Sequence, residues 1–173
     1  AYANKKVTAP DMLVGGCDAY GGVRHDHIPV RELPVEKDDT DTLAALRHAL
    51  SLGYGEIVIY CALGGRTDHM LANIQAAAFA VKNGATVHIL GTETEITVLS
   101  GSKIIIPKKA GYSLSVFSIT DKSDGVTISG VKYPLTNAEI SNTFPIGVSN
   151  EWIGNAEISV KNGILAIVIS KLI

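Results

Sequence analysis

The feature that most constrains the fold is an abrupt change in sequence pattern near Leu90. Before this point short β-type segments alternate with helical ones, as where Met70, Ile74 and Val81 recur at helical spacing. After Gly91 only short β-type segments follow, separated by Gly, Asn, Asp and Pro clusters. The first pattern is typical of a parallel sheet covered by helices, and the second of an antiparallel sandwich or small barrel.

We therefore predict an α/β fold with two domains. Residues 1–92 are expected to form a three-layer α/β domain with a mostly parallel sheet, and residues 93–173 an antiparallel β-sandwich or barrel. The alternative, a single mixed sheet with every strand in one layer, is less favoured because the change of periodicity is so complete. The last predicted strand, residues 164–169, is apolar at nearly every position, which predicts that both of its faces are covered.

Composition limits the possible classes of protein. The 173 residues are 46% apolar and 18% charged, which predicts a buried core and excludes a disordered chain. A net charge of -2 gives no bulk attraction to nucleic acid or to an anionic membrane, and residues 163–170, the longest apolar stretch, are too few to cross a bilayer. We expect a cytoplasmic protein with no nucleic-acid or membrane partner, whose Cys17 and Cys61 are reduced thiols.

A run of acidic residues, Lys37-Asp38-Asp39-Thr40-Asp41, opens the first predicted helix. Asp38 and Asp41 are three residues apart and can face the same point once the turn forms. Such a pair suits Mg²⁺, which takes one or two carboxylates and shares its other sites with water and phosphates. The alternative is helix capping by Asp39 or Thr40, with acids stabilising the helix dipole. Metal binding is favoured because capping alone does not require three neighbouring like charges.

A glycine turn, Gly64-Gly65, follows a buried-type strand and leads through Arg66-Thr67-Asp68-His69 into the second helix. Glycine lets the backbone approach a phosphate, the helix N-terminus offers N–H groups, and Arg66 adds a cation. The alternative is an ordinary tight turn with Thr67 or Asp68 as the N-cap. A further segment, GGCDAYGG at residues 15–22, also lies at a strand end, where ligands bind in α/β sheets.

The segment Gly147-Val148-Ser149-Asn150-Glu151-Trp152 places the single Trp beside small hydrogen-bonding residues. An aromatic plane next to amide and hydroxyl groups can seat a flat heterocycle. A Trp that closes one end of a barrel core explains the same pattern equally well.

These segments resemble the thiamine pyrophosphokinase (thiamin diphosphokinase) family, especially its bacterial form. The resemblance rests on GGCDAYG, LPVEKDDTDTLAAL, ALGGRTDHMLANI, GVKYPL and GVSNE, in this order, and covers essentially the whole chain. It implies transfer of a pyrophosphoryl group from ATP to thiamine, giving thiamine diphosphate and AMP. It also implies an ATP- and Mg²⁺-binding domain at residues 1–92, a thiamine-binding β-sandwich at residues 93–173, and a homodimer with thiamine between subunits.

The resemblance assigns roles to individual residues. The catalytic acids would be Asp18, Asp41 and Asp68, with Asp18 and Asp41 both candidates for the general base. The Mg²⁺ ligands would be these acids together with Asp38. The residues implied for the nucleotide are Lys37, Thr40, Gly64, Gly65, Arg66 and His69, and those implied for thiamine are Tyr133, Ser149 and Asn150.

The sequence departs from the family pattern in two places. Where the family has G-D-F-D-S, this chain has Gly15-Gly16-Cys17-Asp18-Ala19, without the first acid and the hydroxyl. Ala1 aligns with the family's first helix, which implies that the leading strand and its Asp-Gly-Gly turn are missing. These departures favour an alternative, a catalytically impaired homologue that binds thiamine or nucleotide. A third hypothesis is an α/β nucleotide-binding protein of unrelated function.

Overall fold

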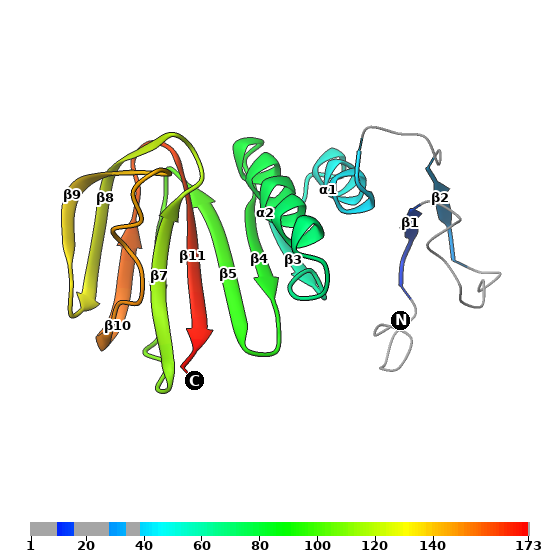
Figure 1. Ribbon diagram of the computed structural model, residues 1–173. Coiled ribbons are helices and arrows are strands. Elements are labelled where there is room, and N and C mark those ends of the chain that lie inside the picture. The colour runs from blue at the N-terminus through cyan, green and yellow to red at the C-terminus, as the bar shows by residue number, and fades with distance from the viewer. Residues whose placement is uncertain (1–9, 16–27, 34–38, 173) are drawn as a thin grey trace. The chain divides into compact units, whose positions relative to one another are not determined.

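The computed structural model describes residues 10–15, 28–33 and 39–172, which belong to two compact units (Figure 1). The first unit ends at Gly53 and the second begins at Tyr54. In the first, β1 (Leu13–Gly15) and β2 (Val30–Glu32) pair in parallel, and the helix α1 (Asp41–Ser51) follows. The second unit contains the helix α2 (Thr67–Lys82) and the strands β3 to β11.

Helix α1 begins where the acidic run predicts a helix start. Thr40 is its N-cap, and the Thr40 hydroxyl accepts a hydrogen bond from the backbone N–H of Leu43 at 3.2 Å. Asp39, the other predicted cap, instead pairs with Arg47 at 3.0 Å. The helix ends just before Gly53, whose φ of 84° is a conformation that glycine adopts without strain.

The strands of the second unit form two sheets. The five-stranded sheet has the order β3-β4-β5-β11-β7 and the four-stranded sheet the order β6-β10-β8-β9. Their bounds are β3 (Glu56–Tyr60), β4 (Thr86–Leu90), β5 (Thr94–Ser100), β6 (Lys103–Ile106), β7 (Tyr112–Ser118), β8 (Lys122–Val131), β9 (Leu135–Ser141), β10 (Trp152–Ser159) and β11 (Ile164–Lys171). Figure 1 shows α2 on one side of the larger sheet and the smaller sheet on the other.

The α/β class is as predicted, but the larger sheet is mixed rather than mostly parallel. β3 and β4 are parallel, whereas β4 and β5, β5 and β11, and β11 and β7 are antiparallel. The reason is a tight turn in which the N–H of Gly91 donates to the carbonyl of Thr94 at 2.8 Å, so the chain folds straight back onto β4. The predicted boundary at Thr92 lies in this turn, and the larger sheet continues across it.

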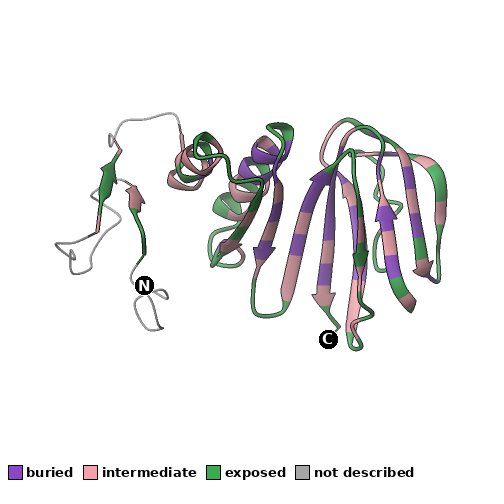
Figure 2. Cartoon of the chain, turned by 180° about the vertical axis from the view of Figure 1, so that it is seen from behind, coloured by how far each residue is buried: buried purple, intermediate pink, exposed green. Residues whose placement is uncertain are grey.

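The core of the second unit lies between the two sheets, and Figure 2 shows buried residues along the strands of both sheets. β11 is central to it, with β5 on one side and β7 on the other. Leu165 and Ile167 of this strand belong to the core between the sheets, while Ala166 is buried on the opposite face, the side on which α2 packs. The prediction that both faces of the last strand are covered is therefore confirmed.

One strand was not expected from the sequence. The pattern predicts a single strand running from β8 through residues 132–135, but the chain turns there and β9 returns along β8. β9 and β10 share the pentapeptide NAEIS and pair with β8 on opposite sides. Both of its glutamates make ion pairs, Glu139 with Lys122 at 2.8 Å and Glu157 with Lys103 at 2.7 Å. The same pentapeptide thus forms part of two strands, β9 and β10, on either side of β8.

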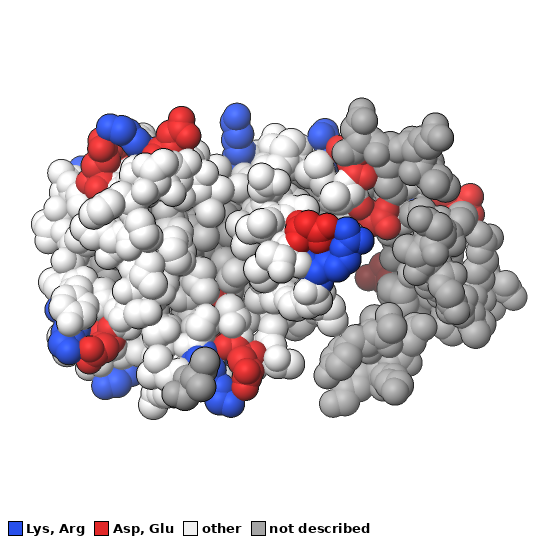
Figure 3. Space-filling view, in the orientation of Figure 1, with Lys and Arg blue, Asp and Glu red and all other residues white. Residues whose placement is uncertain are grey.

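Charged side chains of opposite sign lie next to one another on the face shown in Figure 3, with broad uncharged areas between them. Of the two helices in the described part of the chain, neither is long and apolar enough to span a membrane.

Candidate functional site

The loop between β3 and α2 holds the glycine turn that the sequence predicts for phosphate binding. Gly64 and Gly65 have φ values of 87° and 67°, a conformation in which any other residue would be strained. The loop is anchored at its start, because the side-chain amide of Asn73 on α2 donates to the carbonyl of Ala62 at 3.0 Å. The turn is therefore held in place, and it is exposed to solvent directly before the N-terminus of α2.

Arg66 and Asp68 bind each other at this N-terminus. Arg66 donates from Nε to Oδ1 of Asp68 at 3.1 Å and from Nη2 to Oδ2 at 2.5 Å. The ion pair lowers the pKa of the Asp68 carboxyl, first through the Arg66 hydrogen bond, and raises the pKa of Arg66. The predicted caps Thr67 and Asp68 are wrong, because Arg66 occupies the N-cap position and makes no side-chain cap.

Oδ1 of Asp68 also accepts a hydrogen bond from the backbone N–H of His69 at 2.9 Å. Asp68 and His69 are both exposed, as are Gly64 and Gly65. Four of the residues assigned to the nucleotide, Gly64, Gly65, Arg66 and His69, thus lie on one solvent-facing loop and the first turn of α2, whereas Thr40 is the N-cap of α1.

Asp41 lies at the first turn of α1 and is partly buried. Its carboxylate rests against the end of β1, where a methyl group added to Gly15 would stand 3.4 Å from Oδ2 of Asp41. Such a methyl group would be in ordinary van der Waals contact with the carboxylate, so the Asp41 side chain lies close to the backbone of β1. Asp18, Lys37 and Asp38, also assigned from the sequence, lie outside the described residues.

No three His, Cys, Asp or Glu side chains converge within residues 10–15, 28–33 and 39–172 in a way that could hold a metal ion. Asp41 and Asp68 supply carboxylate oxygens, which are the donors that Mg²⁺ prefers. Each carboxylate taken by itself, Asp41 in the first unit and Asp68 in the second, has the chemistry that fits this ion.

The three residues assigned to thiamine come together at one end of the sandwich. Asn150 accepts from the N–H of Tyr133 through Oδ1 at 3.0 Å and donates from Nδ2 to the Tyr133 carbonyl at 2.8 Å. The neighbouring Ser149 has a φ of 57°, and its N–H donates to the hydroxyl of Ser115 at 2.9 Å. Hydrogen bonds within the protein therefore fix the backbone around all three residues.

The side chains of Tyr133 and Ser149 face solvent, and Tyr133 is 60% exposed. The ammonium group of Lys132 lies 5.5 Å from the centre of the Tyr133 ring and 2.7 Å from Oε1 of Glu151. That carboxylate raises the pKa of Lys132. The exposed groups here are thus an aromatic ring, a hydroxyl and a paired charge.

Trp152 resolves one of the alternatives that the sequence left open. It packs against the core between the sheets, and its indole N–H donates to the carbonyl of Tyr112 at 2.8 Å. It therefore closes the end of the core, as the second interpretation of this Trp expected.

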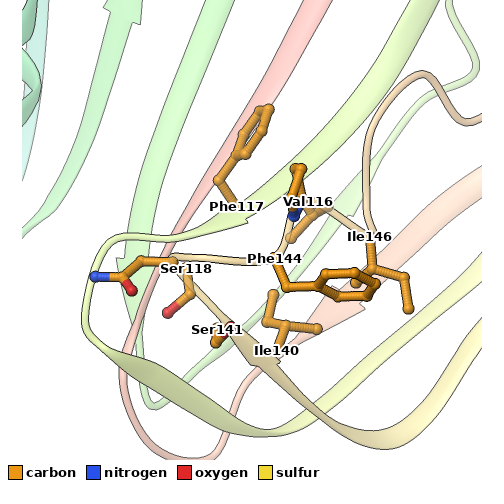
Figure 4. A pocket seen from close by; sticks show the side chains of 9 residues that line it. Val116, Phe117, Ser118, Ile140, Ser141, Phe144 and Ile146 are labelled. Carbon is orange, nitrogen blue, oxygen red and sulfur yellow. The ribbon is translucent and has the colours of Figure 1, made fainter.

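A small hollow lies between β7 and the segment that follows β9. Its volume is about 30 Å³, enough for one or two water molecules. Figure 4 shows the ring of Phe144 lying beside Ile140 and Ile146. The hollow is too small for a heterocyclic substrate.

Sequence reasoning missed two residues that shape this segment. A side chain at Gly147 would bring its Cβ to 2.4 Å from the carbonyl oxygen of Val116, so only glycine allows segment 147–150 to lie this close to β7. Ser115 provides the hydroxyl that holds the backbone of Ser149. Gly147 was visible in the motif, but Ser115 lies 34 residues before Ser149 and carries no sequence signal.

Family models match both halves of the chain. Residues 1–89 match the model described as "Thiamin pyrophosphokinase, catalytic domain", and residues 102–165 match "Thiamin pyrophosphokinase, vitamin B1 binding domain". Gly64, Gly65, Arg66 and Asp68 fall in the first matched region. Tyr133, Ser149 and Asn150 fall in the second.

Individual relatives agree with the family models. A thiamine pyrophosphokinase of Bacillus subtilis (strain 168) is 31% identical over 135 residues, which are 77% of this chain and 63% of that protein. The chain thus spans less than two thirds of the length of this curated relative.

Solved structures are similar in fold as well as in sequence. A crystal structure of thiamine pyrophosphokinase from Bacillus subtilis has a TM-score of 0.74 and 30% identity, covering 84% of this chain and 68% of that one. One from Geobacillus thermodenitrificans has a TM-score of 0.69 and 29% identity, covering 83% and 66%. The chain belongs to the thiamin pyrophosphokinase family.

Proposed function

We propose that this chain transfers the diphosphate group of ATP to thiamine, giving thiamine diphosphate and AMP. The observation that carries the proposal is the match of both halves of the chain to the catalytic and vitamin B1 binding models of one family. The geometry supports it, because the assigned residues Tyr133, Ser149 and Asn150 lie together at one end of the sandwich.

Nucleotide binding is assigned to the turn before α2 and to residues near α1. The phosphates would take the exposed N–H groups at the start of α2 and the guanidinium of Arg66, both suited to an anion. Arg66 now holds Asp68, so phosphate binding would release that carboxylate. Gly64, Gly65 and His69 border this anion site, while Lys37 and Thr40 are assigned to the nucleotide on the resemblance alone.

The assigned Mg²⁺ ligands are Asp18, Asp38, Asp41 and Asp68. When bound, Mg²⁺ neutralises phosphate charge during phosphoryl transfer. Asp41 supports this role because its partly buried carboxylate already lies beside the glycine backbone that ends β1. Asp68 supports it because its carboxylate is exposed at the start of α2.

The reaction forms a bond between the thiamine hydroxyl oxygen and the β-phosphorus of ATP. It breaks the bond between that phosphorus and the oxygen bridging to the α-phosphate, and AMP leaves with the bridging oxygen. The hydroxyl proton passes to a carboxylate, for which Asp18 and Asp41 remain the two candidates. Positioning by Ser149, Tyr133 and Arg66 would supply much of the rate, since phosphoryl transfer depends on alignment and charge neutralisation.

Two further features belong to the proposal. Residues 1–92 would bind ATP and Mg²⁺ and residues 93–173 thiamine, in a homodimer acting in the cytoplasm. A dimer is supported by exposed apolar side chains close in sequence to the thiamine residues: Phe144, Ile146 and Val148. Sedimentation at several concentrations tests this part.

Kinetics of single variants test the function. Arg66→Met is expected to raise KM for ATP, and Ser149→Ala to raise KM for thiamine, with thiamine diphosphate identified by mass as the product. Lys103→Met, which breaks an ion pair on the outer face of the sandwich, is the matched control and should change neither value. A wild type that binds thiamine and ATP without forming thiamine diphosphate would instead support the impaired homologue.

A further inference from the structure

Asn150 links the two sheets of the sandwich at the end that holds the thiamine residues. Its backbone pairs with Leu114 of β7 in the five-stranded sheet, with hydrogen bonds of 2.7 and 3.1 Å. Its side chain reaches the turn after β8 in the four-stranded sheet, at Tyr133. One residue therefore connects both layers, although they share no strand.

The hydrogen-bonding capacity of the Asn150 side chain is almost entirely used inside the protein. Oδ1 accepts from the backbone N–H groups of Tyr133 at 3.0 Å and Glu151 at 3.1 Å, which fills both of its lone pairs. Nδ2 donates one of its two hydrogens to the Tyr133 carbonyl at 2.8 Å. Because Asn150 is only 5% exposed, little of the amide is left for a ligand.

Tyr133, by contrast, is held from both sides and offers its side chain to solvent. Its N–H and its carbonyl both bond to the one amide of Asn150, which fixes the direction of the chain at this residue. The backbone next to it is fixed as well, since the N–H of Lys132 donates to the carbonyl of Glu151 at 2.9 Å. The ring itself is 60% exposed.

We propose that Asn150 is a positioning residue that acts on thiamine through Tyr133, rather than a residue that contacts thiamine. This rests on the proposed function, because it concerns the same site. It reassigns Asn150 from the substrate-binding role implied by the resemblance and leaves Tyr133 and Ser149 as the contacting side chains. Ser149 is independent of the Asn150 amide, since its backbone is held by the Ser115 hydroxyl.

The experiment is a pair of double-mutant cycles on the affinity for thiamine, measured by calorimetry without ATP. Asn150→Asp keeps the size of the side chain but turns the donor toward the Tyr133 carbonyl into an acceptor. It is expected to weaken thiamine binding by about 10- to 100-fold, as small displacements of positioning groups do. In a Tyr133→Ala background the same change should cost less than about threefold, while in a Ser149→Ala background it should keep its full effect.

Controls separate positioning from general loss of structure. Trp152, the single Trp, lies two residues from Asn150, so an unchanged emission maximum reports an intact sandwich. Asn155→Asp makes the same chemical change at an exposed asparagine whose Oδ1 accepts the N–H of Lys108, and should leave thiamine affinity unchanged. In turnover, Asn150→Asp should raise KM for thiamine and leave KM for ATP unchanged.

The outcomes are distinct. If the losses of thiamine affinity caused by Asn150→Asp and by Tyr133→Ala add fully, Asn150 contacts thiamine directly. That result overturns the inference and leaves the proposed function intact. A wild type that binds thiamine but releases no AMP overturns the proposed function, and the cycles still decide the role of Asn150. A wild type without affinity for thiamine overturns both.

Discussion

Arg66 donates two hydrogen bonds, of 2.5 and 3.1 Å, to the carboxylate of Asp68 at the exposed N-terminus of α2. These are the two side chains assigned to the nucleotide phosphates and to the metal ion. In the structure each neutralises the other, so under the proposed function phosphate and metal ion would both compete with this ion pair. Binding of a metal–nucleotide complex would replace the Arg66–Asp68 ion pair with two others. Arg66 would pair with a phosphate, and Asp68 with the metal ion.

The pair makes a prediction about pH. Asp68 has a lowered pKa in the folded chain, so its ion pair stabilises the fold above the pKa of an unpaired aspartate and is lost as the pH falls through the folded value. Arg66→Met removes the largest cause of the shift, so the pKa of Asp68 should rise toward the value of an unpaired aspartate. Carboxyl NMR titration measures this.

The control for this titration is Lys103→Met, because Lys103 pairs with Glu157 on the outer face of the sandwich. It should leave the Asp68 titration unchanged. An Asp68 midpoint that is the same in wild type and Arg66→Met would show that the ion pair does not form in solution.

Close backbone contact at Gly147 predicts a stability difference between two glycines. Gly147→Ala forces a methyl group against the Val116 carbonyl, at a starting distance of 2.4 Å, and should destabilise the chain by about 1–3 kcal/mol. Gly154→Ala on β10 meets nothing within 4 Å and should be neutral or slightly stabilising. Urea unfolding of both variants measures the difference, and equal midpoints would contradict the close packing of segment 147–150 on β7.

The core between the sheets predicts a contrast within one strand. Ile158 of β10 is fully buried, and Ile158→Ala should lower the free energy of unfolding by about 2–5 kcal/mol. Ile153 of the same strand is 68% exposed, and Ile153→Ala should change it by less than about 0.5 kcal/mol. Thermal unfolding followed by Trp152 emission compares the stabilities of the two variants. Similar losses of stability would contradict a core that lies between the sheets.

Much of the fold could be predicted from local pattern. Helical spacing found α2, the acidic run marked the start of α1, and the predicted strand at residues 164–169 lies within β11. β9 was missed because the turn at residues 132–134 carries Lys and Tyr beside its Pro, without the Gly or Asn that usually marks a hairpin. The mixed sheet was missed because strand direction depends on the turn at Gly91, which the strand pattern does not encode.

The sequence could predict which residues belong to the candidate site, but it could not predict how they interact. The glycine turn at Gly64-Gly65 was recognisable because strand, glycine and helix follow one another locally. The partner of Arg66 was not, because an arginine beside an aspartate in sequence bonds to it only when the turn brings both side chains to one side. The hydrogen bonds between Asn150 and Tyr133 join residues 17 positions apart that lie outside the strands, and single-sequence patterns carry no record of such pairs.

Release of AMP is the measurement that decides whether this chain transfers a diphosphate group from ATP to thiamine, as proposed. The chain is incubated with ATP and Mg²⁺, with and without thiamine, and AMP is quantified. The proposed function predicts that AMP forms only when thiamine and Mg²⁺ are both present, in amounts equal to thiamine diphosphate. It also predicts that Asp41→Asn forms much less AMP. AMP formed equally well without thiamine, or none formed by a chain that binds both substrates, would contradict it.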